Sequence, residues 1–99
     1  MKIDDVHYEN IEKRISINVI NNEESTYCLW LEKGEAVLEF ELNHKEKNII
    51  KINGRIGEVI KNANLPEDVQ VSRCVEALEN GLWDYHHPQD NKKRTIGLK

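Results

Sequence analysis

The sequence contains few of the residues that cross-link or interrupt a chain. It has two cysteines and two prolines in 99 residues. Two cysteines are too few for the disulfide scaffold that stabilises many small secreted domains. Because Cys28 lies in a predicted strand and Cys74 in a predicted helix, we expect two reduced, partly buried thiols.

Long apolar runs are also missing. No segment approaches the roughly 20 consecutive apolar residues that a membrane-spanning helix needs. The first ten residues, MKIDDVHYEN, lack the apolar centre of a signal peptide. We therefore expect a cytoplasmic protein without a membrane partner.

The motifs of common catalytic sites are absent. The sequence contains no P-loop, no nucleotide-binding glycine fingerprint, no nucleophile elbow and no zincin motif. The segment Gly54-Arg55-Ile56-Gly57 has two glycines and one arginine, and we interpret it as a turn followed by the start of a helix. The expectation is a protein that is not an enzyme and that needs no cofactor.

Asp84, His86 and His87 come nearest to a metal-binding set, because carboxylate and imidazole groups are ligands of zinc. Adjacent side chains of an extended segment point in opposite directions, so both histidines cannot easily reach one ion. We interpret the segment as a polar chain end before Pro88 and predict no metal. A small metal-binding protein or enzyme is the less favoured alternative.

Charged residues make up 32% of the chain, and the net charge is −4. A negative net charge disfavours general affinity for nucleic acid and for anionic membranes. Acidic residues dominate the body of the chain, whereas the segment 89–99 is basic. We predict a single domain over residues 1–99, in which 1–10 are an arm or an edge strand and 89–99 are a flexible tail.

Three successive strands are predicted over residues 11–42. β-Branched residues alternate with polar ones over 11–20, and the stretch 25–42 contains two further alternating segments. A tight turn at Lys33-Gly34-Glu35 joins these two segments. An antiparallel meander is the most economical arrangement of such neighbouring strands.

Alternation divides the side chains of these strands between two faces. One face is apolar and is predicted to form the core: Ile15, Ile17, Val19, Tyr27, Leu29, Leu31, Leu38, Phe40 and Leu42. The other face combines a large aromatic side chain with carboxylates: Cys28, Trp30, Glu32, Val37, Glu39 and Glu41.

A fourth strand is predicted over 48–53, followed by a short helix near 55–63. One continuous helix over 48–60 is an alternative, but it would contain interior glycines, each of which costs about 1 kcal/mol relative to alanine. The sequence leaves both interpretations open.

The clearest helical pattern runs from Pro66 to Asn80, and Asn80-Gly81 is expected to be its stop signal. In a competing interpretation Val69 and Val71 form a short strand and the helix starts near Ser72. Either way the predicted fold is α+β, a two-layer sandwich in which an antiparallel sheet of about four strands carries one or two helices on one face.

One or two helices can cover only one face of such a sheet. The face with Trp30 therefore needs other cover, which the N-terminal arm, Trp83, Tyr85, the tail, a second copy or a partner can supply. An aromatic anchor among carboxylates is typical of a protein interface. The predicted partner-binding residues are Trp30, Glu32, Val37, Glu39 and Glu41.

These features favour a small, acidic, non-enzymatic protein-binding domain. In composition it is similar to bacterial immunity proteins and to small phage-type inhibitors. Such a protein occludes a basic partner, for example a toxin or a nucleic-acid-handling protein. Its carboxylates occupy the positions at which the partner would bind the phosphates of a nucleic acid. We expect that this protein does not itself bind nucleic acid. The alternative is a self-associating structural or interaction domain in which the same face forms a two-fold dimer.

Overall fold

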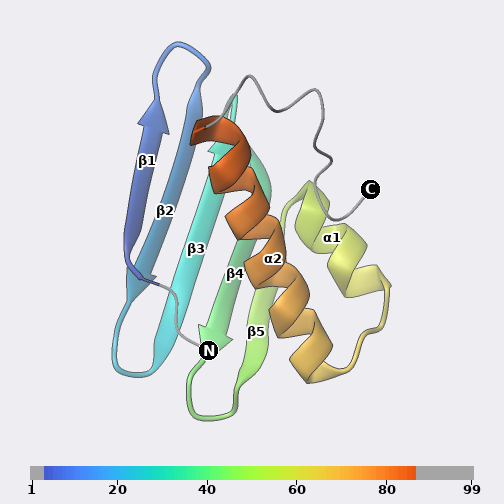
Figure 1. Cartoon of the computed structure of the whole chain (residues 1–99). Helices are drawn as coiled ribbons and strands as arrows, with labels where there is room; N and C mark the ends of the chain where they lie inside the picture. Colours follow the sequence, from blue (N-terminus) through green and yellow to red (C-terminus); the bar gives the residue numbers. More distant parts are fainter. Residues whose placement is uncertain (1–3, 87–99) are drawn as a thin grey trace.

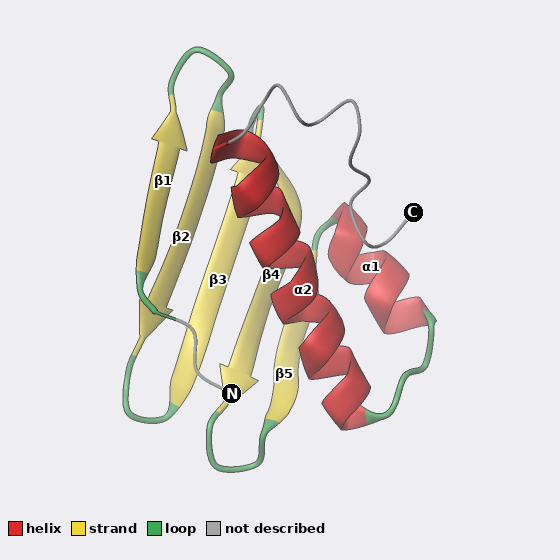
Figure 2. Cartoon of the chain, viewed as in Figure 1, coloured by secondary structure: helices red, strands yellow, loops and turns green. Residues whose placement is uncertain are grey.

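A computed structural model describes residues 4–86 of the chain. Five strands precede two helices: β1 (Val6–Asn10), β2 (Ile15–Asn21), β3 (Ser25–Glu32), β4 (Glu35–Asn43), β5 (Asn48–Asn53), α1 (Arg55–Asn62) and α2 (Glu67–His86). The strands form one antiparallel sheet in chain order, and both helices lie on the same side of it (Figures 1 and 2). The predicted α+β two-layer fold is confirmed.

The sheet has five strands where about four were predicted, and the additional one is β1, within the first ten residues. Of the two predictions for this segment, the edge strand holds, because β1 pairs with β2 over Val6–Asn10. The predicted strand over 48–53 is confirmed as β5, and a helix begins at Arg55, so the alternative of one helix over 48–60 is wrong. The basic segment 89–99 lies outside the described residues.

The turn between β3 and β4 is the predicted tight turn. Its two central residues, Lys33 and Gly34, have φ values of 53° and 81°. Positive φ at both positions is the geometry of a two-residue hairpin turn whose twist matches that of the strands. Glu35, which was assigned to the turn, is the first residue of β4.

A β-bulge in β4 follows directly after this turn. Leu31 pairs with Ala36, as a two-residue turn requires, but Trp30 pairs with Leu38 and skips Val37. Val37 is thus an extra residue in β4, and every later residue of β4 is shifted by one position relative to β3.

This shift decides which face of β3 is buried. Beyond the bulge Cys28 pairs with Phe40, and both lie on the side of the helices. Cys28 and Trp30 are 0% and 1% exposed. The prediction for β3 is therefore wrong, since a slip of one residue moves a whole set of side chains to the opposite face. Three residues predicted for the core lie instead on the other face: Tyr27, Leu29 and Leu31.

Helix α2 does not end at Asn80-Gly81 as predicted but continues to His86. Gly81 is buried inside this helix, where a Cβ atom would clash with Cη2 of Trp30. The glycine therefore makes room for the indole ring and does not stop the helix. The competing interpretation, a strand with Val69 and Val71, is also wrong, because both residues belong to α2.

We expect Gly81→Ala to lower the free energy of unfolding by about 1–3 kcal/mol, because overpacking against Trp30 outweighs the gain of about 1 kcal/mol in helix propensity. Urea unfolding measures this change. Gly57→Ala in α1 is the matched control, since a Cβ there would lie 3.2 Å from the flexible side chain of Ile52. A variant at Gly81 as stable as the wild type would contradict the close contact with Trp30.

The core fills the space between the sheet and the helices. Its buried residues come from β2, β3, β4 and both helices, and the largest are Trp30, Phe40, Ile17, Leu38, Ile60 and Leu78. Neither helix of the described segment 4–86 combines the length and apolar character that crossing a bilayer requires.

Candidate functional site

The side of the sheet opposite α1 and α2 is the candidate site, and we call it the open face. Neither described helix lies on it (Figure 2). Strand register gives its side chains, strand by strand: His7 and Glu9; Ser16, Asn18 and Ile20; Tyr27, Leu29 and Leu31; Glu39 and Glu41; Lys51 and Asn53.

An apolar row and an acidic row lie side by side at the centre of the open face. Tyr27 is paired with Glu41, and Leu29 is paired with Glu39. Directly paired side chains of an antiparallel sheet lie about 5 Å apart at Cβ, so each carboxylate borders an apolar side chain. Tyr27, Leu29 and both glutamates are half-buried, which leaves part of each side chain accessible.

Glu39 is the centre of a hydrogen-bonded cluster. The hydroxyl of Tyr27 donates to Glu39 Oε2, and Asn53 Nδ2 donates to Oε1 at 3.0 Å. Lys51 Nζ lies 3.5 Å from Oε2 and 5.8 Å from the centre of the Tyr27 ring. The bond from Tyr27, followed by the bond from Asn53 and the charge of Lys51, holds the pKa of Glu39 below its ordinary value. Glu39 is therefore a carboxylate at neutral pH.

Partial burial and the hydrogen bond to Glu39 raise the pKa of Tyr27 from 10.0 to about 12. Because folding favours the neutral phenol, its stabilisation is present below pH 10.0 and is lost as the pH rises to about 12. A difference titration of tyrosinate absorbance between wild type and Tyr27→Phe isolates this group. We expect Glu39→Gln to lower the pKa of Tyr27 and Glu41→Gln to change it less. An unshifted Tyr27 would contradict the cluster.

The carboxylate of Glu41 has fewer contacts within the chain than that of Glu39 and is therefore more available to a binding partner. One of its oxygens accepts a hydrogen bond from Ser25 Oγ at 2.8 Å. Lys51 is paired with Glu41 in register but contacts Glu39 instead. Within residues 4–86, no cation forms an ion pair with Glu41.

The five predicted partner-binding residues do not form one surface. Glu39 and Glu41 lie on the open face, whereas Trp30 and Val37 are 1% and 2% exposed in the core. Glu32 lies on the helix side, where Arg55 is 3.6 Å from its carboxylate. Sequence reasoning missed the apolar half of the open face, which it had assigned to the core: Tyr27, Leu29 and Leu31.

Within one chain, Tyr85 covers Trp30, and Tyr85 was among the covers that the sequence analysis predicted for it. Its indole Nε1 donates to the Tyr85 hydroxyl at 3.1 Å, and that hydroxyl donates to Glu32. Tyr8 of β1 stacks on Tyr85 with ring centres 5.6 Å apart. Burial, followed by the bond to Glu32, raises the pKa of Tyr85 above its ordinary value. These contacts fasten the end of α2 to the sheet.

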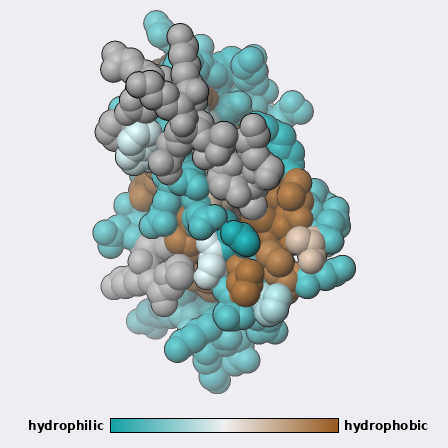
Figure 3. Space-filling view, turned by 45° about the vertical axis from the view of Figure 1, so that its right-hand side comes forward, coloured by the Kyte–Doolittle hydropathy of each residue, from teal (hydrophilic) through white to brown (hydrophobic). Residues whose placement is uncertain are grey.

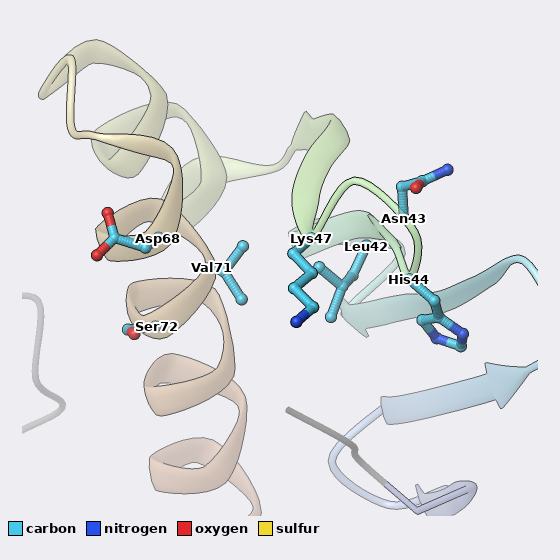
Figure 4. Close-up of a pocket in the computed structure, with 7 residues that line it drawn as sticks. All are labelled: Leu42, Asn43, His44, Lys47, Asp68, Val71 and Ser72. Carbon is cyan, nitrogen blue, oxygen red and sulfur yellow. The ribbon is translucent and has the colours of Figure 1, made fainter.

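A cleft of about 250 Å³ lies between the start of α2 and the turn from β4 to β5. Its floor is apolar, and Val71 points from α2 toward Lys47 and Leu42 across the gap (Figure 4). Neither Lys47 nor Asp68 at its rim forms an ion pair with another described residue. His44, which also lines the cleft, is hydrogen-bonded through Nε2 to Thr26 Oγ1 at 2.7 Å. The lining residues are Leu42, Asn43, His44, Lys47, Asp68, Val71 and Ser72.

Within the described residues, neither the thiols nor Asp84 and His86 belong to a cluster that could hold a metal ion. Cys28 and Cys74 are free and buried, and burial raises the pKa of each to about 12, so both are neutral thiols. Asp84 is buried in α2, His86 is exposed, and His87 lies outside the described residues. No group of three or more potential ligands that could hold a metal ion occurs in the described part of the chain.

Comparison of the chain with protein-family models, with curated proteins and with solved structures gives no match.

Proposed function

We propose that this protein is a non-enzymatic, cytoplasmic protein-binding domain whose open face binds a basic protein. The observation that carries the proposal is the row of Tyr27, Leu29 and Leu31 beside the carboxylates Glu39 and Glu41, on a face that neither described helix covers. Apolar groups next to carboxylates suit a partner that presents lysine or arginine among apolar side chains.

The apolar part of the open face can supply affinity. Tyr27 is an aromatic residue with a polar tip, a type that is enriched among the residues that dominate binding energy. Ile20, which is paired with Tyr27 on the neighbouring strand, is 58% exposed. A contiguous exposed apolar patch with a polar rim is the usual mark of a protein interaction site.

The acidic part can supply orientation and speed of association. Glu39 is held as a carboxylate by its neighbours, and Glu41 has no ion-pair partner in residues 4–86. Carboxylates at the edge of an interface steer a basic partner and disfavour acidic ones. An immunity or inhibitor protein that occludes a basic toxin or a nucleic-acid-handling protein uses this kind of surface.

Capture of partners from a lysate of the native host tests the proposal. We expect Glu41→Lys and Leu29→Ser each to reduce recovery of the partner at least about tenfold, which corresponds to 1.4 kcal/mol of binding free energy. Glu79→Lys is the matched control, because Glu79 is exposed on α2, away from the open face.

Circular dichroism verifies that each variant is folded. Equal recovery by wild type, Glu41→Lys and Leu29→Ser would overturn the proposal. Loss of recovery with Glu79→Lys alone would move the binding surface to the helices.

A further inference from the structure

We propose that the protein forms a homodimer in which β5 pairs with β5 of a second copy across a two-fold axis. β5 pairs with β4 alone among the described strands and is therefore one edge of the sheet. An edge strand presents a row of unpaired backbone N–H and C=O groups, and an extended strand is what satisfies them. This surface is distinct from the open face.

The sequence of β5 is self-complementary. It reads Asn-Ile-Ile-Lys-Ile-Asn from Asn48 to Asn53. In an antiparallel pair whose two-fold axis passes between Ile50 and Lys51, each asparagine meets an asparagine and Ile49 meets Ile52. Lys51 then lies opposite Ile50 and not opposite the second lysine, so like charges are not directly paired.

The faces of the sheet agree with this register. Ile49 is paired with Leu42 and Ile52 with Phe40, so both isoleucines lie on the core side. Directly paired residues share a face, so in the proposed register these two would extend the apolar layer from one copy to the other.

Ile50 is an exposed apolar residue of this edge strand. A second β-bulge lies here: Lys51 is paired with Glu41 and Ile49 with Leu42, so Ile50 has no counterpart on β4. Its side chain is 54% exposed. A bulge and a lysine are both devices that discourage edge pairing, but β5 has no proline, and Lys51 Nζ lies 3.5 Å from Glu39 of β4, on the side away from the free edge.

The other edge of the sheet is less suited to self-pairing. β1 is five residues long and β5 is six. Glu9 lies in β1, with Asp4, Asp5 and Glu12 immediately outside it. In a two-fold pairing of β1 centred on Tyr8, Asp4 would lie opposite Glu12, and directly opposed like charges destabilise a strand pair.

Apolar surface continues beyond β5. α1 packs on both β4 and β5, and its Val59 is 55% exposed. Figure 3, which brings the α1 side forward, shows apolar side chains gathered there. A two-fold axis perpendicular to the sheet would keep the helices of both copies on one side and the two open faces on the other.

Sedimentation velocity of the full chain between about 1 and 200 µM tests the dimer, because dimer population depends on concentration. We expect a monomer–dimer equilibrium whose dissociation constant rises at least tenfold in Ile50→Lys. Ile20→Lys is the matched control, since Ile20 is 58% exposed on the open face, and it is expected to leave the constant unchanged.

A monomer throughout this concentration range would overturn the proposal. A dimer broken by Ile20→Lys and not by Ile50→Lys would also overturn it and would place self-association on the open face. Thermal unfolding of each variant identifies a misfolded protein. Amide hydrogen exchange in β5 is a second readout, with protection expected to increase with protein concentration only if β5 is paired.

Discussion

Replacement of Trp30 by alanine is expected to lower the free energy of unfolding by about 3–5 kcal/mol, as for other large aromatic side chains removed from a core. Trp30 is 1% exposed and packs against Gly81 of α2. The substitution also removes the donor that Tyr85 accepts from at 3.1 Å. One side chain thus links the centre of the sheet to the last turns of the helix, and its loss creates a cavity at their junction.

The measurement is urea unfolding followed by circular dichroism, with Trp83→Ala as the control. Trp83 is 36% exposed on α2, so its truncation is expected to cost less than half as much as that of Trp30. A Trp30→Ala variant of nearly wild-type stability would mean that the indole does not fill the core.

Replacement of Gly54 by alanine is expected to lower the free energy of unfolding by about 2–4 kcal/mol, through backbone strain and a steric clash. Gly54 has φ 94° and ψ 166°, which a residue with a side chain rarely adopts. A Cβ there would lie 2.7 Å from the carbonyl carbon and oxygen of Val37. These atoms belong to the bulge of β4, and backbone cannot rotate away as a side chain can.

Gly34→Asn separates the two causes. Gly34 also has a positive φ, of 81°, but the nearest atom to an added Cβ is Arg14 Nη2 at 4.0 Å. Asparagine tolerates left-handed angles, so we expect a loss of no more than about 1 kcal/mol. Similar losses at both glycines would contradict the close approach of Gly54 to the bulge.

Much of the fold could be predicted from local patterns. The alternation over residues 11–42 and the turn at Lys33-Gly34 gave the meander, and the isoleucines around Lys51 gave β5. These features depend on residues that are close in sequence, where side-chain period and turn chemistry act directly. The apolar stripe of α2 was visible for the same reason.

The faces of β3 could not be predicted, because a bulge in β4 reverses them. A regular hairpin with a two-residue turn would place Leu29 opposite Leu38, and both would enter the core. The extra residue at Val37 instead places Trp30 opposite Leu38. Whether a strand accommodates a bulge depends on packing against distant segments, here Gly54 against Val37 and Gly81 against Trp30. Local sequence patterns therefore cannot predict the bulge.

The same bulge explains why the candidate site was predicted only in part. Glu39 and Glu41 are polar residues of an alternating strand, so their place on an accessible face followed from period alone. Leu29 and Tyr27 were assigned to the core because they are apolar. Only the register of β3 with β4 brings these four side chains together.

Tyr27, Leu29 and Leu31 of β3 lie on the open face, where Tyr27 and Leu29 are paired with Glu41 and Glu39. Thiol labelling of a Leu29→Cys variant under native conditions tests this placement directly, because Cys28 and Cys74 are both buried and serve as internal controls. Mass spectrometry of peptides from the labelled protein should find rapid modification at position 29 and little at the two native cysteines. Rapid modification of Cys28 with protection at position 29 would contradict the account.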